Sequence, residues 1–215
     1  MRIYLASTSP ARLAILRAAG IEPTVVHSNV DEPAVVRSAE ASHGPLDTAA
    51  MVQLLARAKA EAVAGSLIDG EPIDGFIIGG DSAFELDGIA YGKPHTPEVA
   101  QARWRAQRGA TGRLYSGHWV IDHRGGRAGR ASGAPASASV TFADDISDDE
   151  IDAYIASGEP LEVAGAFTID SLGGPFISRV DGDPSTVVGL SLPMLRRILL
   201  DLGVSWPLLW NRRPL

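Results

Sequence analysis

The sequence contains no cysteine, only five histidines and no long apolar run. The lack of cysteine excludes disulfides, thiolate metal sites and a cysteine nucleophile. The histidines are scattered without a pair at HExxH spacing, so we do not expect a zinc enzyme of that kind. No stretch approaches the roughly 20 apolar residues that cross a bilayer, so we expect no membrane association. Residues 1–5 predict a strand rather than a signal peptide, which favours the cytoplasm.

The chain also lacks an excess of positive charge, since its formal net charge is −7. Long nucleic acids bind through basic surfaces, so this chain is not expected to bind them. A small anionic ligand is compatible with this charge where a few basic residues converge, particularly with a bridging cation. The 215 residues are 45% apolar and 21% charged, as in ordinary globular proteins. That length suits one large domain or two small lobes around a cleft.

Short apolar runs alternate with segments of helical periodicity, a pattern typical of an α/β fold. The apolar runs predict strands at residues 3–6, 24–27, 76–79, 114–122, 137–143 and 176–180. Apolar spacing and capping side chains predict helices at residues 11–19, 47–64, 97–107, 147–156 and 192–202. Asp87 and Gly88 predict a two-residue hairpin turn. Residues 29–45 are expected to be irregular and residues 124–135 to form a mobile loop.

Ser7, Ser9 and Arg12 lie between the first predicted strand and the first predicted helix. A helix N-terminus offers free N–H groups and a partial positive charge. Hydroxyls and a guanidinium at this place add donors, so the segment suits a phosphate group. The alternative is that Ser9 only caps the helix while Arg12 points into water.

Carboxylates follow two of the predicted strands. Asp81 comes directly after residues 76–79, at the edge where α/β sheets bind ligands. Asp31 and Glu32 follow the second strand and are candidates to complete a metal site with Asp81, because Mg²⁺ uses carboxylate and phosphate oxygens together. An exposed acidic turn at residues 31 and 32 is the alternative.

Two lysines are candidates for binding phosphate. Lys59 lies on the apolar face of the helix at residues 47–64, where it either faces phosphates or covers the edge of the core with its stem. Lys93 follows the predicted hairpin, and Pro94 favours an extended backbone there. Lys93 is therefore either a fixed point charge for a phosphate or a solvated loop residue.

Together these segments resemble the Maf family of nucleoside triphosphate pyrophosphatases, also called septum formation proteins, and in particular its actinobacterial branch. The similarity extends over nearly the whole chain. The motifs that carry it are LASTSPAR at residues 5–12, VDE at 30–32, LARAKA at 55–60, GDS at 80–82, LDG at 86–88, GKP at 92–94, GEPL at 158–161, AGAF at 164–167 and VVGL at 187–190.

The resemblance implies a single Maf-like domain over residues 1–215. Its fold is expected to have a mixed central sheet flanked by helices, with two lobes around a cleft, as in inosine triphosphate pyrophosphatases. The implied enzyme is a hydrolase that converts a nucleoside triphosphate to the monophosphate and pyrophosphate with Mg²⁺ or Mn²⁺, with modified nucleotides among the candidate substrates. Asp81 matches the family's catalytic position. The matched phosphate- and metal-site positions are Ser7, Arg12, Glu32, Lys59 and Lys93.

Several positions depart from the family pattern. Ala11 replaces an arginine, Val163 replaces a lysine and Asp170 replaces a glutamine, so the preferred base is left open. The sequence also leaves open whether Asp81 is a base or a metal ligand. A nucleotide-binding regulator of cell division with little turnover is the rival function, because two cations are missing. The apolar residues 204–210 cover either the core or a partner in a homodimer.

Overall fold

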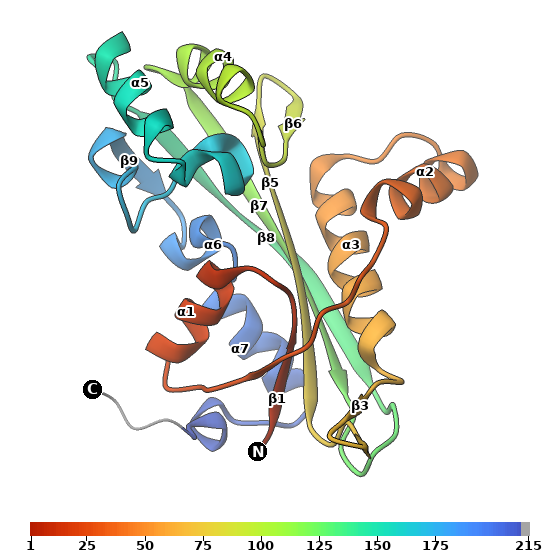
Figure 1. Ribbon diagram of the computed structural model, residues 1–215. Coiled ribbons are helices and arrows are strands. Elements are labelled where there is room, and N and C mark those ends of the chain that lie inside the picture. Colours follow the sequence, from red (N-terminus) through yellow and green to blue (C-terminus); the bar gives the residue numbers. More distant parts are fainter. Residues whose placement is uncertain (212–215) are drawn as a thin grey trace. The chain divides into compact units, whose positions relative to one another are not determined.

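The computed structural model describes residues 1–211 and contains a seven-stranded mixed sheet flanked by helices (Figure 1). The strand order is β2-β1-β5-β7-β8-β9, with β6 paired to β5. The strand β1 runs parallel to β2 and β5, whereas β6 is antiparallel to β5 and β9 is antiparallel to β8. The expected α/β class with a mixed central sheet is therefore confirmed.

The strands of this sheet are β1 (Ile3–Ala6), β2 (Thr24–Val25), β5 (Phe76–Leu86), β6 (Ile89–Tyr91), β7 (Thr111–Asp122), β8 (Ala131–Phe142) and β9 (Ile177–Asp181). A separate hairpin is made by β3 (Leu67–Ile68) and β4 (Glu71–Pro72). The helices are α1 (Pro10–Ala18), α2 (Glu32–His43), α3 (Thr48–Val63), α4 (Pro97–Gln107), α5 (Asp148–Ala156), α6 (Pro184–Val188) and α7 (Leu192–Asp201). Short 3₁₀ turns lie at Glu159–Glu162, Ala164–Ala166, Gly174–Phe176 and Trp206–Leu209.

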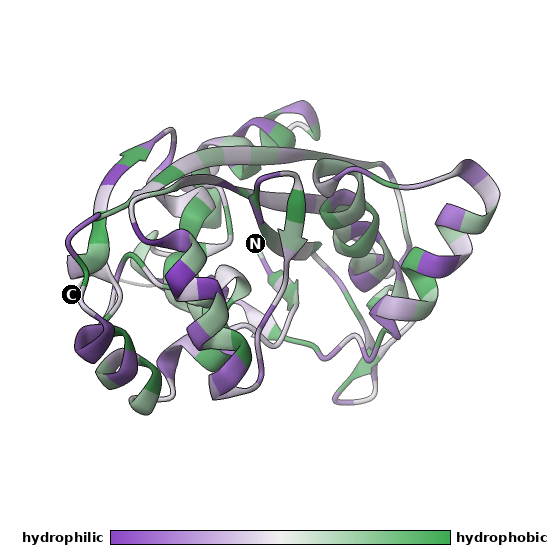
Figure 2. Ribbon diagram, turned by 90° about the horizontal axis from the view of Figure 1, so that it is seen from above, coloured by the Kyte–Doolittle hydropathy of each residue, from purple (hydrophilic) through white to green (hydrophobic). Residues whose placement is uncertain are grey.

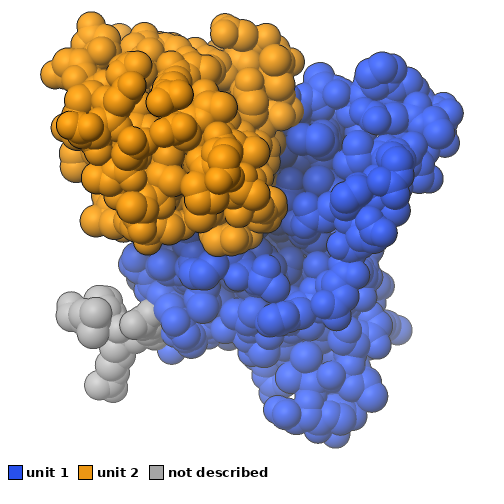
Figure 3. Space-filling view, turned by 45° about the horizontal axis from the view of Figure 1, so that its top comes forward, with its two compact units in different colours: residues 1–81, 116–136, 189–215 blue, residues 82–115, 137–188 orange. Residues whose placement is uncertain are grey.

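The chain divides into two compact units (Figure 3). Unit 1 comprises residues 1–81 and 116–136 and the described residues from 189 onward, and unit 2 comprises residues 82–115 and 137–188. The strands β5, β7 and β8 each contribute residues to both units.

Unit 1 has helices on both faces of its part of the sheet. Alternate residues along β1 point to opposite faces. Leu5 packs in an apolar cluster with Leu16 of α1 and Leu195 of α7, while Tyr4 packs in a second cluster with Val63 of α3. Figure 2 shows hydrophobic and hydrophilic residues interspersed along the helices. This pattern lets α1, α3 and α7 each bury one face against the sheet.

Helix α3 lies very close to the sheet because two strands carry a glycine beneath it. A Cβ on Gly79 would lie 2.1 Å from the carbonyl oxygen of Ala56, and one on Gly117 would lie 2.2 Å from that of Val52. Real Cβ atoms do not approach a backbone this closely, so glycine sets the distance between helix and sheet at these places.

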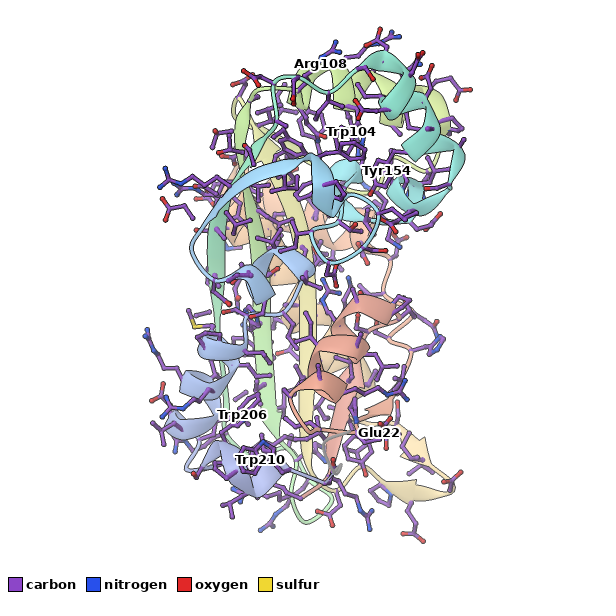
Figure 4. The ribbon with its side chains drawn as sticks, turned by 90° about the vertical axis from the view of Figure 1, so that its left-hand side faces the viewer. Glu22, Trp104, Arg108, Tyr154, Trp206 and Trp210 are labelled. Atoms are coloured by element: carbon purple, nitrogen blue, oxygen red, sulfur yellow. The ribbon has the colours of Figure 1, made fainter. Side chains whose placement is uncertain are left out.

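Unit 2 has its own core, built around Trp104 of α4 (Figure 4). Trp104 packs edge-to-face on Tyr154, with ring centroids 5.2 Å apart, and on Phe142, at 5.5 Å. Its indole nitrogen donates a 2.7 Å hydrogen bond to the carbonyl of Ala166. The buried ring thus satisfies its polar atom, as buried tryptophans usually do.

Most predicted elements occur where they were expected, but three expectations are wrong. Residues 29–45 are not irregular, because they contain the 12-residue helix α2. The strand predicted at residues 76–79 continues to Leu86, so Asp81 lies in the middle of β5 rather than after its end. The loop expected at residues 124–135 is shorter, because β8 already begins at Ala131.

The C-terminal apolar segment contributes to the core of unit 1. Val204 and Leu209 are buried with α7, whereas Leu208 and Trp210 are exposed. Figure 4 shows Trp206 and Trp210 in this segment. Pro207 interrupts regular helix formation, and the segment forms a 3₁₀ turn. Among the described residues, no helix is long and apolar enough to cross a membrane.

Candidate active site

Ser7, Ser9 and Arg12 are organised by the junction between β1 and α1. Ser9 is the N-cap of α1, and its hydroxyl oxygen accepts a hydrogen bond of 3.4 Å from the backbone N–H of Arg12. The Ser7 hydroxyl oxygen accepts from the Ser9 N–H at 3.2 Å and from the Arg12 guanidinium at 3.0 Å. Ser9 therefore does cap the helix, but Arg12 does not point into water, since only 7% of it is exposed.

The Arg12 guanidinium is fixed by two segments that are distant in the sequence. Its Nε–H donates a 2.8 Å hydrogen bond to the carbonyl oxygen of Gly189. Its side chain also packs against Gly80 of β5, where an added Cβ would lie 3.1 Å from Nε. Gly80 thus makes room for the guanidinium, and Gly189 sets the direction of its N–H groups.

Lys59 of α3 connects the two carboxylates that the sequence analysis selected. Its ammonium group lies 2.6 Å from Oδ1 of Asp81 and 2.7 Å from Oε1 of Glu32. The side chains of Lys59 and Asp81 are nearly buried, whereas that of Glu32 is 45% exposed. Lys59 is therefore more than an apolar stem at the edge of the core, because its charge is held in a buried ion pair.

Burial acts against the charged forms of Asp81 and Arg12. Burial raises the pKa of Asp81 above its ordinary value, although the nearby charges of Lys59 and Arg12 act in the opposite direction. Burial also lowers the pKa of Arg12, against the attraction of Asp81 and Glu32. Arg12 and Asp81 are therefore perturbed groups in a poorly solvated place, and such groups gather at functional sites.

Helix α2, which was not predicted from the sequence, positions Glu32. Asp31 caps this helix by accepting a 3.0 Å hydrogen bond from the Ala34 N–H, so Glu32 occupies the first helical position. A cap followed by a proline in the first turn is a recognisable start signal. Asp31 thus serves the helix, and Glu32 is the member of the pair that reaches Lys59.

Lys93 belongs to unit 2, and the other predicted site residues belong to unit 1. It follows β6, and its ammonium group lies 3.4 Å from Glu162 in an exposed ion pair. Exposed pairs of this kind are weak, so Lys93 can exchange Glu162 for another anion at little cost.

The residues that departed from the family pattern lie at three different places. Ala11 is in the first turn of α1. Val163 separates two 3₁₀ turns of unit 2. Asp170 lies in the turn at residues 168–173, which the carboxylate of Glu159 holds through hydrogen bonds from Thr168, Ser171, Leu172 and Gly173.

The carboxylates of Glu32 and Asp81 fit a hard divalent cation whose remaining ligands come from water and from the substrate. Oxygens of Glu32 and Asp81 converge on one point, where the lysine ammonium now supplies the positive charge. Among residues 1–211, no group of three or more metal-ligating side chains is found. Mg²⁺ usually takes one or two carboxylates and completes its shell with water and phosphate oxygens. Two carboxylates at this place satisfy that requirement.

These features define an α/β protein whose buried charge cluster, beside a helix N-terminus, suits a small anionic ligand. The chain belongs to the Maf family, since the family model for Maf-like proteins matches residues 2–202. The family match extends across both compact units.

Similar proteins from other organisms cover nearly the full chain. One from Leifsonia xyli subsp. xyli, named nucleoside triphosphate pyrophosphatase, is 73% identical over 99% of this chain and 98% of its own. Proteins of the same name from Nocardia farcinica and Streptomyces coelicolor are each 49% identical over 97% of this chain and cover 96% and 94% of their own lengths. The solved structure of the Staphylococcus aureus Ham1 protein covers 94% of this chain and 96% of its own, at 15% identity and a TM-score of 0.44.

Proposed function

We propose that the protein hydrolyses a nucleoside triphosphate to the nucleoside monophosphate and pyrophosphate. The observation that carries the proposal is the buried cluster in which Lys59 joins Asp81 and Glu32, with Arg12 close enough to influence the pKa of Asp81. The three relatives described above all bear the name of this activity, and their identity extends over nearly the whole chain.

The substrate's phosphates are assigned to the cations and to the N-terminus of α1. Ser7 and Ser9 present hydroxyl groups there, and Arg12 adds a fixed guanidinium. Lys59 supplies a point charge that offsets the charge of the triphosphate, while the assignment of Lys93 to the phosphates stays a prediction from the sequence. Since Ala11 provides no charge, Arg12 and Lys59 take a larger share of the binding than they would beside a second arginine.

The reaction itself is a displacement at the α-phosphorus. The oxygen of a water molecule bonds to that phosphorus, the bond to the bridging oxygen breaks, and pyrophosphate leaves with the bond's electron pair. We assign Asp81 as the acceptor of the water's proton, because burial raises its pKa and so strengthens it as a base. The cations then stabilise the negative charge that develops on the leaving group.

The proposal includes Mg²⁺ or Mn²⁺, with Glu32 and Asp81 as its protein ligands. Such a cation supplies Lewis acidity that withdraws charge from phosphate oxygens. Glu32 and Asp81 would hold the cation, and Lys59, which now pairs with both carboxylates, would then pair with the substrate's phosphates.

Two further properties belong to the same proposal. The absence of cysteine is compatible with a reducing cytoplasm as the place of action. The exposed side chains of Leu208 and Trp210, at 61% and 60% exposure, offer apolar area for a homodimer. Sedimentation of the protein at several concentrations tests the dimer, and a constant monomer mass would remove it.

The direct test is product analysis with a panel of normal and modified nucleoside triphosphates. Each is incubated with the protein and Mg²⁺ or Mn²⁺, and the products are separated and quantified. Equal amounts of monophosphate and pyrophosphate support the proposal. Diphosphate with orthophosphate would contradict it, and binding without turnover would instead favour a regulatory protein. The panel also identifies the preferred base, which Asp170 leaves open.

A further inference from the structure

His118 of β7 is fully buried in unit 1, and its two ring nitrogens have different partners. Its Nε2 lies 2.8 Å from the backbone nitrogen of Ser191, and its Nδ1 lies 3.1 Å from the carbonyl oxygen of Ala134. A backbone N–H can only donate and a carbonyl can only accept. The arrangement therefore requires a neutral imidazole with its proton on Nδ1 and an acceptor at Nε2.

Ser191 links this imidazole to the segment that orients Arg12. Ser191 is the N-cap of α7, and its hydroxyl accepts a 3.3 Å hydrogen bond from the Met194 N–H. Two residues earlier, the carbonyl of Gly189 accepts the 2.8 Å hydrogen bond from Arg12 Nε. The three residues from Gly189 to Ser191 thus connect the histidine on one side to the guanidinium on the other.

The backbone of His118 is itself fixed by α3, the helix that carries Lys59. The Gln53 amide donates a 2.9 Å hydrogen bond to the His118 carbonyl and accepts one of 3.3 Å from its N–H. The Cα of the preceding residue, Gly117, faces α3. Because successive side chains of a strand point to opposite faces, the His118 ring lies on the other face of the sheet, where α7 begins. The backbone and the Nδ1 of His118 are therefore held by α3 and β8, and not by the segment from Gly189 to Ser191.

We propose that His118 is a positioning residue for Arg12. By accepting the hydrogen bond from Ser191, its neutral imidazole holds the Gly189 carbonyl where it orients the Arg12 guanidinium. The role deepens the proposed function, because Arg12 is assigned to the phosphates there. Apolar packing of Leu190 alone does not set the direction of the neighbouring carbonyl, whereas a hydrogen bond two residues away restrains it.

The first test observes Arg12 without any reaction. The Nε–H signal of Arg12 is assigned in ¹H–¹⁵N spectra by its loss in Arg12→Lys, and its exchange with water is measured. The wild-type signal is expected to be protected. In His118→Phe, which has similar volume but no acceptor, exchange is expected to become at least tenfold faster. In His118→Gln, whose amide oxygen replaces Nε2, protection is expected to return. Unchanged protection in His118→Phe overturns the proposal.

Substitutions of Ser191 provide the same comparison if His118→Phe does not fold. Ser191→Ala removes only the hydroxyl cap, whereas Ser191→Pro removes the cap and also the N–H that His118 accepts. The φ of Ser191 is −67°, which a proline can adopt. Faster exchange of Arg12 Nε–H in Ser191→Pro than in Ser191→Ala supports the proposal. Equal exchange in the two variants overturns it.

The second test uses turnover and separates positioning from a general loss of structure. His118→Phe is expected to raise KM for the nucleotide about tenfold, the effect of weakening one charged hydrogen bond, with a smaller change in kcat. In an Arg12→Lys background the same substitution is expected to change KM less than twofold. Equal effects in both backgrounds overturn the proposal. If the wild type has no turnover, the proposed function fails, and the exchange measurement still decides the role of His118.

Discussion

The ammonium group of Lys59 donates a 2.6 Å hydrogen bond to Oδ1 of Asp81, and both side chains are nearly buried. Lys59 comes from α3 and Asp81 from the middle of β5, so the pair depends on the close packing of that helix on that strand. A buried ion pair is a poor source of stability, because desolvation offsets much of the attraction. We therefore interpret the Lys59–Asp81 pair as part of a site that binds charged phosphates rather than as a source of stability.

Replacing the Asp81 carboxylate is expected to remove turnover and preserve the fold. Asp81→Asn keeps the shape of the side chain, and Lys59 keeps Glu32 as its partner. Loss of a base or metal ligand is expected to lower kcat by about 100-fold or more. Steady-state kinetics measure this, with circular dichroism as the check on folding. Asp181→Asn is the matched control at an exposed ion pair and should retain full activity. Near-normal turnover in Asp81→Asn would remove Asp81 from its role.

Lys59 and Arg57 lie on the same helix and allow the same substitution at a buried and an exposed ion pair. Lys59→Met leaves two carboxylates without their shared cation and is expected to destabilise the fold by about 3 kcal/mol. Arg57→Met removes an exposed pair with Glu61 and a cation–π contact with Trp119 and is expected to cost about 1 kcal/mol or less. Urea unfolding of both variants measures the difference. Similar losses for the two would contradict the buried pairing of Lys59.

Gly79 is expected to be irreplaceable for steric reasons. A Cβ there would lie 2.1 Å from the Ala56 carbonyl oxygen, so α3 would have to move away from β5. We expect Gly79→Ala to destabilise the fold by about 3 kcal/mol or more and to reduce activity, since Lys59 moves with the helix. Gly65→Ala, where an added Cβ meets no atom within 4 Å, is the control and should change stability by no more than about 0.5 kcal/mol. A stable, active Gly79→Ala enzyme would refute this packing.

Glu159 predicts a pH dependence of stability in unit 2. Burial acts to raise its pKa, but the hydrogen bonds from Ser171, Thr168, Tyr154 and the Leu172 N–H outweigh it, so its pKa is lowered. A depressed carboxyl pKa stabilises the fold above the ordinary value of about 4.3, and this contribution is lost as pH falls through the folded-state value.

Glu159→Gln tests this dependence because it replaces one carboxylate oxygen by an N–H donor, which then faces the groups that donate hydrogen bonds to Glu159. We expect a loss of about 1 to 3 kcal/mol at pH 7 that shrinks below about pH 4, measured by urea unfolding across pH. Glu162→Gln, at an exposed carboxylate nearby, is the control and should show little loss at either pH. A pH-independent difference for Glu159→Gln would exclude the carboxylate as its cause.

The sequence predicted best those helices whose first and last turns are marked by capping residues nearby in the chain. Helix α4 was predicted with the same bounds, because Pro97 begins it and Gly109 follows its end at a φ of 72°. The capping box of Ser147 and Glu150 likewise opens α5. Helix α2 was not predicted although Asp31 gave a start signal, because two prolines and a glycine in residues 29–45 indicated irregular structure. In the structure Pro33 lies in the first turn of the helix and Gly44 caps its end.

Other features depend on residues that are far apart in the sequence and leave no local pattern. Gly79 and Gly80 were interpreted as the end of a strand, yet they make room for α3 and for Arg12 within a longer strand. A shared site of Glu32 and Asp81 was proposed from their positions after two strands, but no local pattern indicated that Lys59 pairs with both. Neither His118 nor Gly189 was selected as part of the site, since their partners lie 73 and 177 residues away.

The most direct measurement of the proposed chemistry is hydrolysis in H₂¹⁸O with Mg²⁺ or Mn²⁺, followed by mass spectrometry of both products. Attack of water on the α-phosphorus predicts one ¹⁸O in the nucleoside monophosphate and none in the pyrophosphate. Label in the pyrophosphate, or in released orthophosphate, would contradict the proposed reaction.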